Sequence, residues 1–379
     1  MAVTTYIAMR LVETPVKPSA TLGVSQPASL SLHASRARIF SEPGFHVWCG
    51  SVIAWDGAWW LFYSRWPEAA GYDAWVTHSE IALARGPSPL GPFASSNHVL
   101  LPGPCRHAWE RDVAHNPTVV AAGNRLYLAY MANHGPVHRH SPPALIPINA
   151  DWWEHRNNQR IGVASAPHPM GPWETPDRPT LDASEAGWDS LLVNNPALFQ
   201  IADGQWAMIY KGVATGPRPF GGAVLHGLAE GAHPGGPYSK VAGSHPFSDG
   251  RSPFPAEDPF AWYDSTAGVY RAIVKDMEGA LAGVGRSLVF FESKDAREWN
   301  LSSLPAVPGS EIIWEDGKAE EFSRIERPQV TFDTEGRAVA LQLACLPAGS
   351  GRVSFSLSIP LPPDFFENGW DSDTSRLRR

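Results

Sequence analysis

Short apolar runs and polar turns alternate along the chain in a unit that occurs five times, with copies roughly seventy residues apart. Each copy opens with a polar residue, usually followed by proline, and continues into a short apolar run. The copies open at Cys49, Asn116, Asn195, Asp258 and Arg327. A period of this length exceeds that of most solenoid repeats and suits one four-stranded propeller blade. The pattern predicts an all-β fold, a five-bladed β-propeller.

The remainder of each copy repeats as well. Glycine-containing turns, which tolerate the positive φ angles of tight hairpins, connect the first apolar run to an aromatic-rich second strand. Second strands are expected at 59–63, 126–130 and 206–210, third strands at 81–84, 161–164, 225–229 and 288–292, and Gly-Pro-aromatic turns at 91–93, 171–173 and 236–238. The same turn at the same place in three copies indicates equivalent blades.

The repeats also predict the domain organisation. Residues 1–40 carry no repeat and are expected to form an arm that packs on the propeller and lends it a strand, residues 41–360 to form the propeller, and residues 361–379 a polar tail. Long segments at 95–111 and 133–160 are expected to be loops. Loops of this length in compact domains are usually functional.

Composition narrows the classes of function. The chain of 379 residues has a net charge of −8 and a pI near 5.9, so it offers no basic face to nucleic acid or an anionic membrane. Its 16 tryptophans supply blade cores and flat faces on which sugar rings stack. The three cysteines are expected to be reduced. No signal-peptide pattern or long apolar run is visible, which predicts a cytoplasmic protein that does not enter a membrane.

The propeller fold places the chemistry on one face. The innermost strands line the central axis and run in one direction, and each antiparallel second strand ends on the face where the first begins. The inner ring of residues expected on this face is Cys49, His115, Asn116, Asn194, Asn195, Glu257, Asp258, Glu326 and Arg327, and the outer ring is Arg65, Trp66, His134, Lys211, Asp276 and Glu278. Charged groups gathered in one concavity are costly unless a ligand uses them.

Two adjacent carboxylates, Glu257 and Asp258, open the fourth copy. Lys275, Asp276 and Glu278 end the neighbouring strand. A turn needs no such cluster, so we expect a functional site in which pKa values are perturbed. Because successive strand residues point in opposite directions, Glu257 and Asp258 are not expected to face the same substrate atom.

Other polar residues on this face admit two interpretations each. Asn116 and Asn195 precede prolines, where asparagine serves either as a turn former or as part of the site. The cations Arg65, Lys211 and Arg327 either hold an anionic sugar or a phosphate by charge-assisted hydrogen bonds or pair with the surrounding acids.

Several of these motifs resemble the five-bladed propeller glycoside hydrolases, the group of glycoside hydrolase families 43 and 117 and the invertases. They are the tripeptide Glu257-Asp258-Pro259, the Asn-Pro pairs at 116–117 and 195–196, and the run Ile-Gly-Val-Ala-Ser-Ala-Pro-His-Pro-Met-Gly-Pro-Trp at 161–173. The likeness spans all five copies, from about residue 45 to residue 359. It implies a glycosidase that needs no cofactor and acts on an oligosaccharide or another glycoside, in carbohydrate metabolism and polysaccharide degradation.

The resemblance also implies roles for single residues. Glu257, in a Glu-X-Pro sequence, corresponds to the general acid of family 43. The general base and the pKa-tuning aspartate of that family correspond to Cys49 and Asn195, where this chain has no carboxylate. The family 43 mechanism therefore does not transfer whole.

Glycoside hydrolysis ordinarily needs two carboxyl groups, one to protonate the leaving oxygen and one to activate water or attack. The partner of the acid is sought among Asp258, Asp276, Glu326 and Asp112, and the alternation of strand residues favours Asp276 or Asp112. His115 is an alternative acid, because imidazole titrates near neutral pH.

These observations predict an exo-acting, inverting glycoside hydrolase in which the segments 95–111 and 133–160 close a pocket around the end of an oligosaccharide. The substrate-binding residues expected are Asn116, Asn195, Asp258, Glu326, Arg327, Arg65, Trp66, Lys211 and His134. Two alternatives stay open. One is a glycoside phosphorylase similar to the propeller-fold mannoside phosphorylases of family 130, and the other is a carbohydrate-binding propeller without catalysis.

The histidines give no zinc motif. His138, His140 and His155 share the segment 133–160, but no Cys or His spacing matches a zinc site. Some propeller glycosidases hold a calcium-like ion in the central channel, and the resemblance therefore allows a structural divalent cation there, with no ligands assigned.

Overall fold

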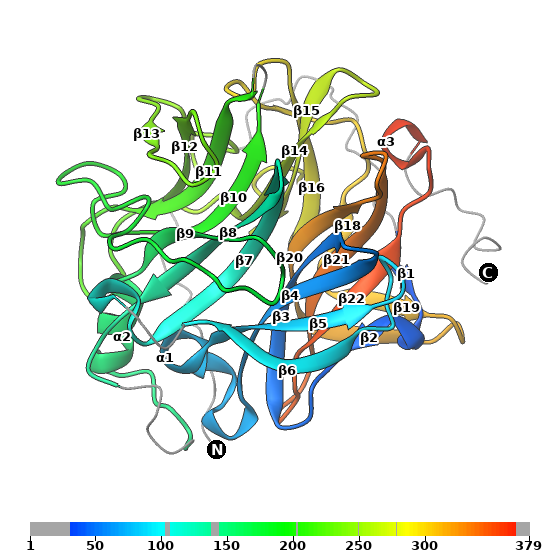
Figure 1. Cartoon of the computed structure of the whole chain (residues 1–379), viewed down its shortest axis with the longest axis horizontal. Helices are drawn as coiled ribbons and strands as arrows, with labels where there is room; N and C mark the ends of the chain where they lie inside the picture. The colour runs from blue at the N-terminus through cyan, green and yellow to red at the C-terminus, as the bar shows by residue number, and fades with distance from the viewer. Residues whose placement is uncertain are drawn as a thin grey trace, which may run out of the picture.

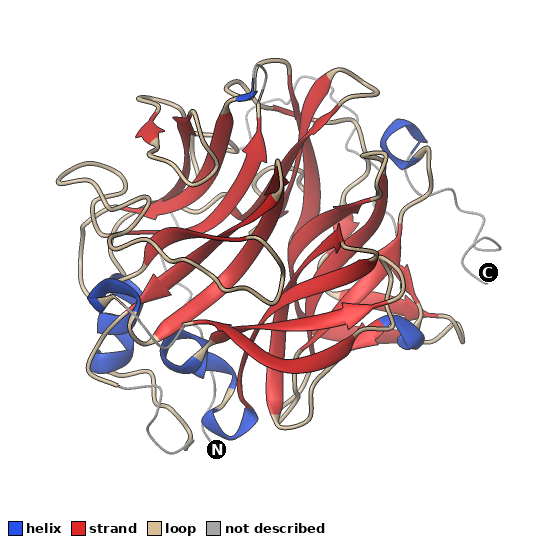
Figure 2. Cartoon of the chain, in the orientation of Figure 1, coloured by secondary structure: helices blue, strands red, loops and turns tan. Residues whose placement is uncertain are grey.

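The computed structural model describes residues 31–102, 107–137, 144–201, 204–248, 250–277 and 279–368. Five mainly antiparallel sheets surround a central axis, as Figure 1 and Figure 2 show, and the predicted five-bladed β-propeller is confirmed. No helix in these ranges is long and apolar enough to span a membrane.

Each blade begins at the axis and proceeds outward by hairpins. Blade one contains β3 (Phe45–Trp55), β4 (Ala58–Pro67), β5 (Glu80–Gly86) and β6 (Ala94–Leu101). Blade two contains β7 (Val113–Ala122), β8 (Arg125–Asn133) and β9 (Arg160–Ala166), and blade three contains β10 (Leu192–Gln200), β11 (Trp206–Val213), β12 (Val224–Gly231) and β13 (Ser239–Lys240). Blade four contains β14 (Ala256–Asp264), β15 (Val269–Asp276), β16 (Ser287–Ser293), β17 (Asn300–Leu301) and β18 (Val307–Pro308).

Blade five joins the two ends of the described chain. Its main strands are β19 (Glu311–Trp314), β20 (Ala319–Phe332), β21 (Ala338–Pro347) and β22 (Phe355–Pro360). Two strands from the N-terminal side complete it, because β2 (Ile39–Phe40) pairs with β22 and β1 (His33–Ala34) pairs with β19. The first 30 residues of the predicted arm and residues 369–379 of the predicted tail lie outside the described ranges.

Helical segments are short and lie between the strands. They include η1 (Arg36–Arg38), η2 (Glu68–Ala70), η3 (Tyr72–Ala74), α1 (Trp75–His78), η4 (Ala108–Glu110), α2 (Ala150–Asn157) and α3 (Phe365–Asn368). The helix α2 falls in the segment 133–160 that the sequence predicted to be a loop. The segment 95–111 is likewise not all loop, because β6 occupies much of it as the outer strand of its blade. The edge strand β6 is largely polar and half exposed, so its sequence lacks the alternating apolar pattern that predicts a strand.

Every innermost strand carries a β-bulge at the residue that opens its sequence repeat. These five residues, here called the axial ring, have φ angles of 55° at Cys49, 56° at Asn116, 49° at Asn195, 58° at Asp258 and 53° at Arg327. The register of each inner hairpin shifts at the bulge. A bulge interrupts the alternation of side chains between the two faces of a strand, so a ring residue and the residue before it need not point apart.

The starts of three inner strands are anchored by a repeated contact. A tyrosine on the second strand donates its hydroxyl hydrogen bond to a carboxylate on the segment before the first strand: Tyr63 to Glu42, Tyr130 to Glu110 and Tyr210 to Asp189. Each tyrosine is buried, and a buried hydroxyl needs such a partner. The contact holds the chain where it enters the blade and so positions the axial end of the sheet.

Candidate functional site

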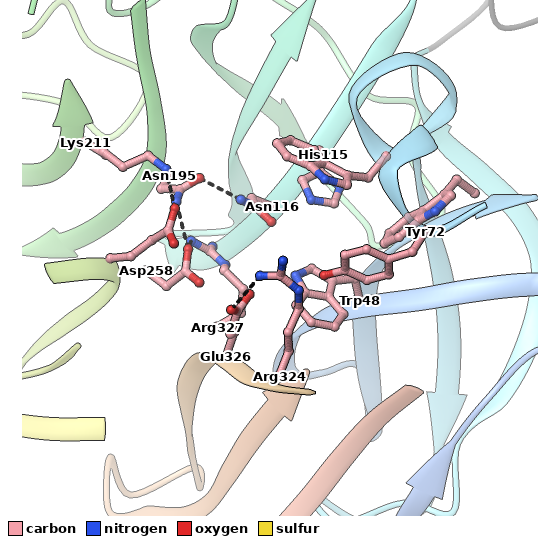
Figure 3. Close-up of a pocket in the computed structure, with 13 residues that line it drawn as sticks. Trp48, Tyr72, His115, Asn116, Asn195, Lys211, Asp258, Arg324, Glu326 and Arg327 are labelled. Carbon is pink, nitrogen blue, oxygen red and sulfur yellow. Dashed lines mark hydrogen bonds and ion pairs between the residues drawn. The ribbon is translucent and has the colours of Figure 1, made fainter. Parts of the chain in front are cut away.

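The face on which the inner strands begin contains a pocket on the propeller axis, with a volume of about 480 Å³ including its mouth (Figure 3). Residues from all five blades line it: Trp48, Trp66, Tyr72, Trp75, His115, Asn116, Asn195, Lys211, Glu257, Asp258, Arg324, Glu326 and Arg327.

Blade one supplies the aromatic wall of the pocket, which consists of Trp48, Trp66, Tyr72 and Trp75. The Tyr72 ring packs edge-on against Trp48 and Trp66, with ring centroids 5.5 Å and 5.8 Å apart. Tyr72 belongs to η3 and Trp75 to α1, which follow β4. Flat aromatic faces of this kind suit the apolar face of a sugar ring.

The helix α2 supports the aromatic wall from outside. Trp152 packs edge-on against Trp75 with centroids 6.4 Å apart, and its indole Nε1 donates to the Asp73 carbonyl at 2.8 Å. Asn149 caps α2 by accepting from the Trp152 backbone N–H at 3.1 Å. The segment 133–160 therefore acts on the pocket indirectly, by buttressing α1.

Blades three, four and five supply the charged wall, which consists of Lys211, Glu257, Asp258, Arg324, Glu326 and Arg327. Ion pairs connect its members. Lys211 pairs with Glu257, and Arg324 Nη1 lies 3.0 Å from Glu326 Oε1. Lys275, behind the wall, pairs with Glu326, and its Nζ lies 3.9 Å from Glu257 Oε2.

These pairs separate the pKa values of the two adjacent carboxyl groups. Burial alone would raise the pKa of Glu257, but Lys211 and Lys275 together lower it to about 2. Burial and the nearby Glu257 raise the pKa of Asp258 to about 6, although Arg327 acts in the opposite direction. The pKa of Glu326 is lowered by Lys275 and Arg324 against the effect of burial. At neutral pH Glu257 and Glu326 are therefore ionised. Of the three carboxyl groups, Asp258 has the pKa nearest to 7.

The axial ring forms the floor of the pocket. The Cys49 thiol donates to Asn116 Oδ1, Asn116 Nδ2 donates to Asn195 Oδ1, and Asn195 Nδ2 donates to Asp258 Oδ1, each at 2.7 Å. Arg327 Nη1 lies 3.4 Å from the same Asp258 oxygen. Burial raises the pKa of Cys49, so the thiol keeps its proton. The chain of donors thus runs in one direction, from Cys49 toward Asp258.

The ring does not suit a hard cation. Its amide oxygens already accept hydrogen bonds, its carboxylate is bound to Asn195 and Arg327, and the Arg327 guanidinium brings a positive charge to the axis. Calcium prefers six to eight oxygen ligands. Within the described ranges, no group of three His, Cys, Asp or Glu side chains is arranged to hold a metal ion.

His115 lies between the two walls. Its Nδ1 is 2.7 Å from the Ser79 hydroxyl oxygen, and its ring stacks on Trp75 with centroids 5.0 Å apart. Burial, followed by the charge of Arg327, holds the pKa of His115 well below its usual value. The imidazole is therefore neutral at pH 7.

The structure brings most of the residues predicted from the sequence into the pocket. The residues placed there are His115, Asn116, Asn195, Glu257, Asp258, Glu326, Arg327, Trp66 and Lys211. Among the cations, Lys211 and Arg327 each pair with a carboxylate of the pocket.

Four predicted site residues do not line the pocket. Asp276 accepts from the backbone N–H groups of 281 and 282 at 3.0 Å and 2.9 Å. Asp112 binds the Arg111 guanidinium, with distances of 3.0 Å and 2.8 Å, and the Gly135 backbone N–H. Arg65 pairs with Glu42 and Glu80, and His134 is partly buried, with its Nδ1 unbonded among the described residues.

A shift of one residue along a strand explains two of these placements. On β15 it is Lys275, not Asp276, that reaches the carboxylates of the charged wall. On β4, Trp66 lines the pocket and its neighbour Arg65 does not. Neighbouring residues on a strand point to opposite faces, so a slip of one position exchanges the pocket side of a sheet for the other side.

Glu257 and Asp258 both line the pocket, although successive residues of a regular strand point in opposite directions. The bulge at Asp258 places this residue in the left-handed region, with a φ of 58°, and breaks the alternation. The repeated polar-Pro motif marks these bulges in the sequence, but it does not reveal their left-handed backbone.

Four pocket residues were not predicted: Trp48, Tyr72, Trp75 and Arg324. Trp48 could have been predicted from the sequence, since it directly precedes Cys49 as Glu257 directly precedes Asp258 in blade four. Tyr72 and Trp75 lie after β4 in a segment with no counterpart in the repeat, and Arg324 lies three residues before its ring residue.

Four residues named from the sequence lie outside the described residues: Cys105, His138, His140 and Glu278. His155 is described and serves the structure, because its Nδ1 lies 3.2 Å from Asn133 Oδ1 and its Nε2 accepts from the Val137 backbone N–H at 3.1 Å.

Solved structures share this fold although the sequences differ greatly. The chain superposes on Zg3597, a family 117 glycoside hydrolase from the marine bacterium Zobellia galactanivorans, with a TM-score of 0.56 and 16% identity over 87% of this chain and 88% of that one. A thermostable family 43 glycoside hydrolase gives 0.53 and 13% over 86% and 92%. An exo-1,5-α-L-arabinanase from a bovine ruminal metagenomic library gives 0.51 and 12% over 86% and 95%.

Comparison of sequences adds no assignment. No protein-family model matches the chain, and no curated protein matches it. The structural similarities, at these identities, establish the five-bladed propeller fold.

Proposed function

We propose that the protein is a glycoside hydrolase that removes a terminal sugar from an oligosaccharide or another glycoside. The observation that carries the proposal is the pocket itself, in which an aromatic wall faces three carboxyl groups, Glu257, Asp258 and Glu326. A pair of carboxyl groups is the usual machinery of glycoside hydrolysis, and aromatic faces suit the apolar face of a sugar ring. The glycoside hydrolases among the similar structures support the same class of reaction.

The shape of the pocket favours chain ends over chain interiors. The hydrogen-bonded side chains of Asn116, Asn195 and Asp258 cross the axis as a floor, and η3 and α1 stand at one side. A substrate entering such a pocket must end in it. This shape supports exo action, which is part of the proposal.

The ionised carboxylate Glu257 is the group that activates water. Lys211 and Lys275 lower its pKa to about 2, so Glu257 is ionised at neutral pH, can accept a proton and does not carry the proton of the general acid that the resemblance to family 43 implies. Direct attack of the activated water on the anomeric carbon would invert its configuration. Inversion is thus part of the proposal.

Hydrolysis of a panel of aryl glycosides and oligosaccharides tests the function. The wild type is expected to release a monosaccharide without phosphate, and Glu257→Gln to lose roughly 10²- to 10⁴-fold in kcat. The anomer released first, observed by NMR, distinguishes inversion from retention. An endo pattern of products would contradict the pocket argument.

A phosphorylase is the second candidate, because Lys211, Arg324 and Arg327 line the same pocket and guanidinium and ammonium groups bind phosphate. Turnover only in the presence of phosphate would establish it. Affinity for a sugar with no turnover under either condition would instead identify a carbohydrate-binding propeller.

A further inference from the structure

The environment of Asp258 differs from that of the other two carboxyl groups in the pocket. Glu257 and Glu326 are each bound to a lysine or arginine of the charged wall. Asp258 uses only one oxygen: Oδ1 accepts from Asn195 Nδ2 at 2.7 Å and lies 3.4 Å from Arg327 Nη1. Its second oxygen, Oδ2, accepts no hydrogen bond from any described residue. A pocket carboxyl group with one oxygen fixed and the other without a hydrogen-bond partner among the described residues can hold a proton on that second oxygen.

We propose that Asp258 is the proton donor of the cleavage, with Oδ2 facing the glycosidic oxygen. The proposal rests on the glycoside hydrolase function given above. The Oδ2 proton moves to the glycosidic oxygen as the bond from that oxygen to the anomeric carbon breaks, and the electron pair of the bond stays on the leaving oxygen. Water adds to the anomeric carbon and gives a proton to Glu257. Exchange with solvent then returns a proton to Asp258 and removes one from Glu257.

The charges around Asp258 match this role. Besides burial, the carboxylates Glu257 and Glu326 favour its protonated form, whereas Arg327 and Lys211 favour its ionised form. Their balance raises the pKa of Asp258 to about 6, and a general acid works best when its pKa lies near the working pH. Asn195 and Arg327 stabilise the carboxylate that remains after the proton has left.

Other pocket groups are poorer donors. Lysine and arginine partners keep Glu257 and Glu326 ionised, and the pKa of His115 lies well below its usual value, so its ring carries no acidic proton at pH 7. The proton donor is thus Asp258, the residue next to Glu257, which the resemblance to family 43 indicates as the acid. The bulge makes this possible, because it turns Asp258 into the pocket.

A series of aryl glycosides with leaving groups from dinitrophenol to phenol tests the proposal, with a sugar that the wild type hydrolyses. A good leaving group needs no proton. Asp258→Asn is therefore expected to lose roughly 10²- to 10⁴-fold in kcat/KM on the phenyl glycoside and less than about tenfold on the dinitrophenyl glycoside. Glu257→Gln, the matched control, is expected to lose activity on both. Equal losses of Asp258→Asn across the series, or none, would overturn the assignment.

A second variant leaves the donor in place and covers the case in which Asp258→Asn does not fold. Asn195→Gly keeps the left-handed backbone and removes a hydrogen bond to the ionised form of Asp258. The alkaline limb of kcat/KM against pH is expected to move to higher pH, because the pKa of Asp258 rises. An unmoved limb contradicts the proposal. A wild type that hydrolyses no glycoside would instead refute the proposed function, and this assignment with it.

Discussion

The aromatic wall and the charged wall face each other across one axis and are positioned by different interactions (Figure 3). Trp48, Tyr72 and Trp75 are fixed by ring packing among themselves and against α2. The carboxylates of the charged wall are fixed by ion pairs with lysines and arginines. The residue just before the axial ring is Trp48 in blade one and Glu257 in blade four. Equivalent backbone positions can therefore carry either an aromatic ring for stacking or a carboxyl group for proton transfer, depending only on the side chain at that position.

Lys275 is the residue on which the charged wall depends most. It is 4% exposed and reaches both Glu257 and Glu326. Lys275→Met is expected to destabilise the fold by about 3–5 kcal/mol, since removal of one partner leaves buried carboxylates without compensation. Urea denaturation measures the change. Lys318→Met, which removes an exposed lysine paired with Asp316, is the control and is expected to leave stability unchanged. Equal curves for the two variants would show that the ion pairs contribute little.

The aromatic wall is expected to affect binding more than chemistry. Trp75→Ala removes a face of the pocket and the ring that stacks on His115. KM should rise roughly tenfold with little change in kcat, because a stacking contact is worth about 0.5–1.5 kcal/mol beyond its buried area. Steady-state kinetics separate the two constants. A fall in kcat alone would mean that Trp75 acts in the chemical step.

The two acidic groups give opposite pH dependences of stability. The folded pKa of Asp258 is about 6 against 3.8 for its ordinary value, so its contribution is present below pH 3.8 and is lost as pH rises to about 6. Glu257 has a lowered pKa of about 2 against 4.5, so its contribution is present above pH 4.5 and is lost as pH falls. Denaturation at several pH values should therefore show that Asp258→Asn removes a decline in stability between about pH 4 and pH 6. A decline that persists in the variant would assign it to another group.

Arg65 marks the edge of the site. It pairs with Glu42 and Glu80 and does not line the pocket. Arg65→Met is expected to leave KM unchanged while lowering the melting temperature, because it leaves the buried Glu42 without its cation. Lys211→Met, on the pocket side, is expected to raise KM. A similar rise in both variants would place Arg65 at the substrate after all.

Much of the site could be predicted from the sequence, because equivalent positions of the repeat occupy equivalent positions in the blades. Equivalent positions of a propeller meet at the axis, so aligning the copies found Glu257, Asp258, Glu326, Lys211 and the asparagines of the ring. The alignment of the copies did not distinguish between neighbouring positions of one strand. Strand alternation makes position 275 and position 276 face opposite ways, and the repeat alone did not fix the register well enough to choose.

By itself, then, the sequence determined the number of blades, the order of the strands and the face on which polar residues gather, because these follow from a repeated pattern of local signals. Tertiary structure decided the rest. Left-handed bulges turned Glu257 and Asp258 into one pocket, and lysines from neighbouring strands set their charges apart. Tyr72 and Trp75, which have no counterpart in the repeat, completed the aromatic wall. A pKa depends on groups distant in the chain and close in space, and no local pattern records that proximity.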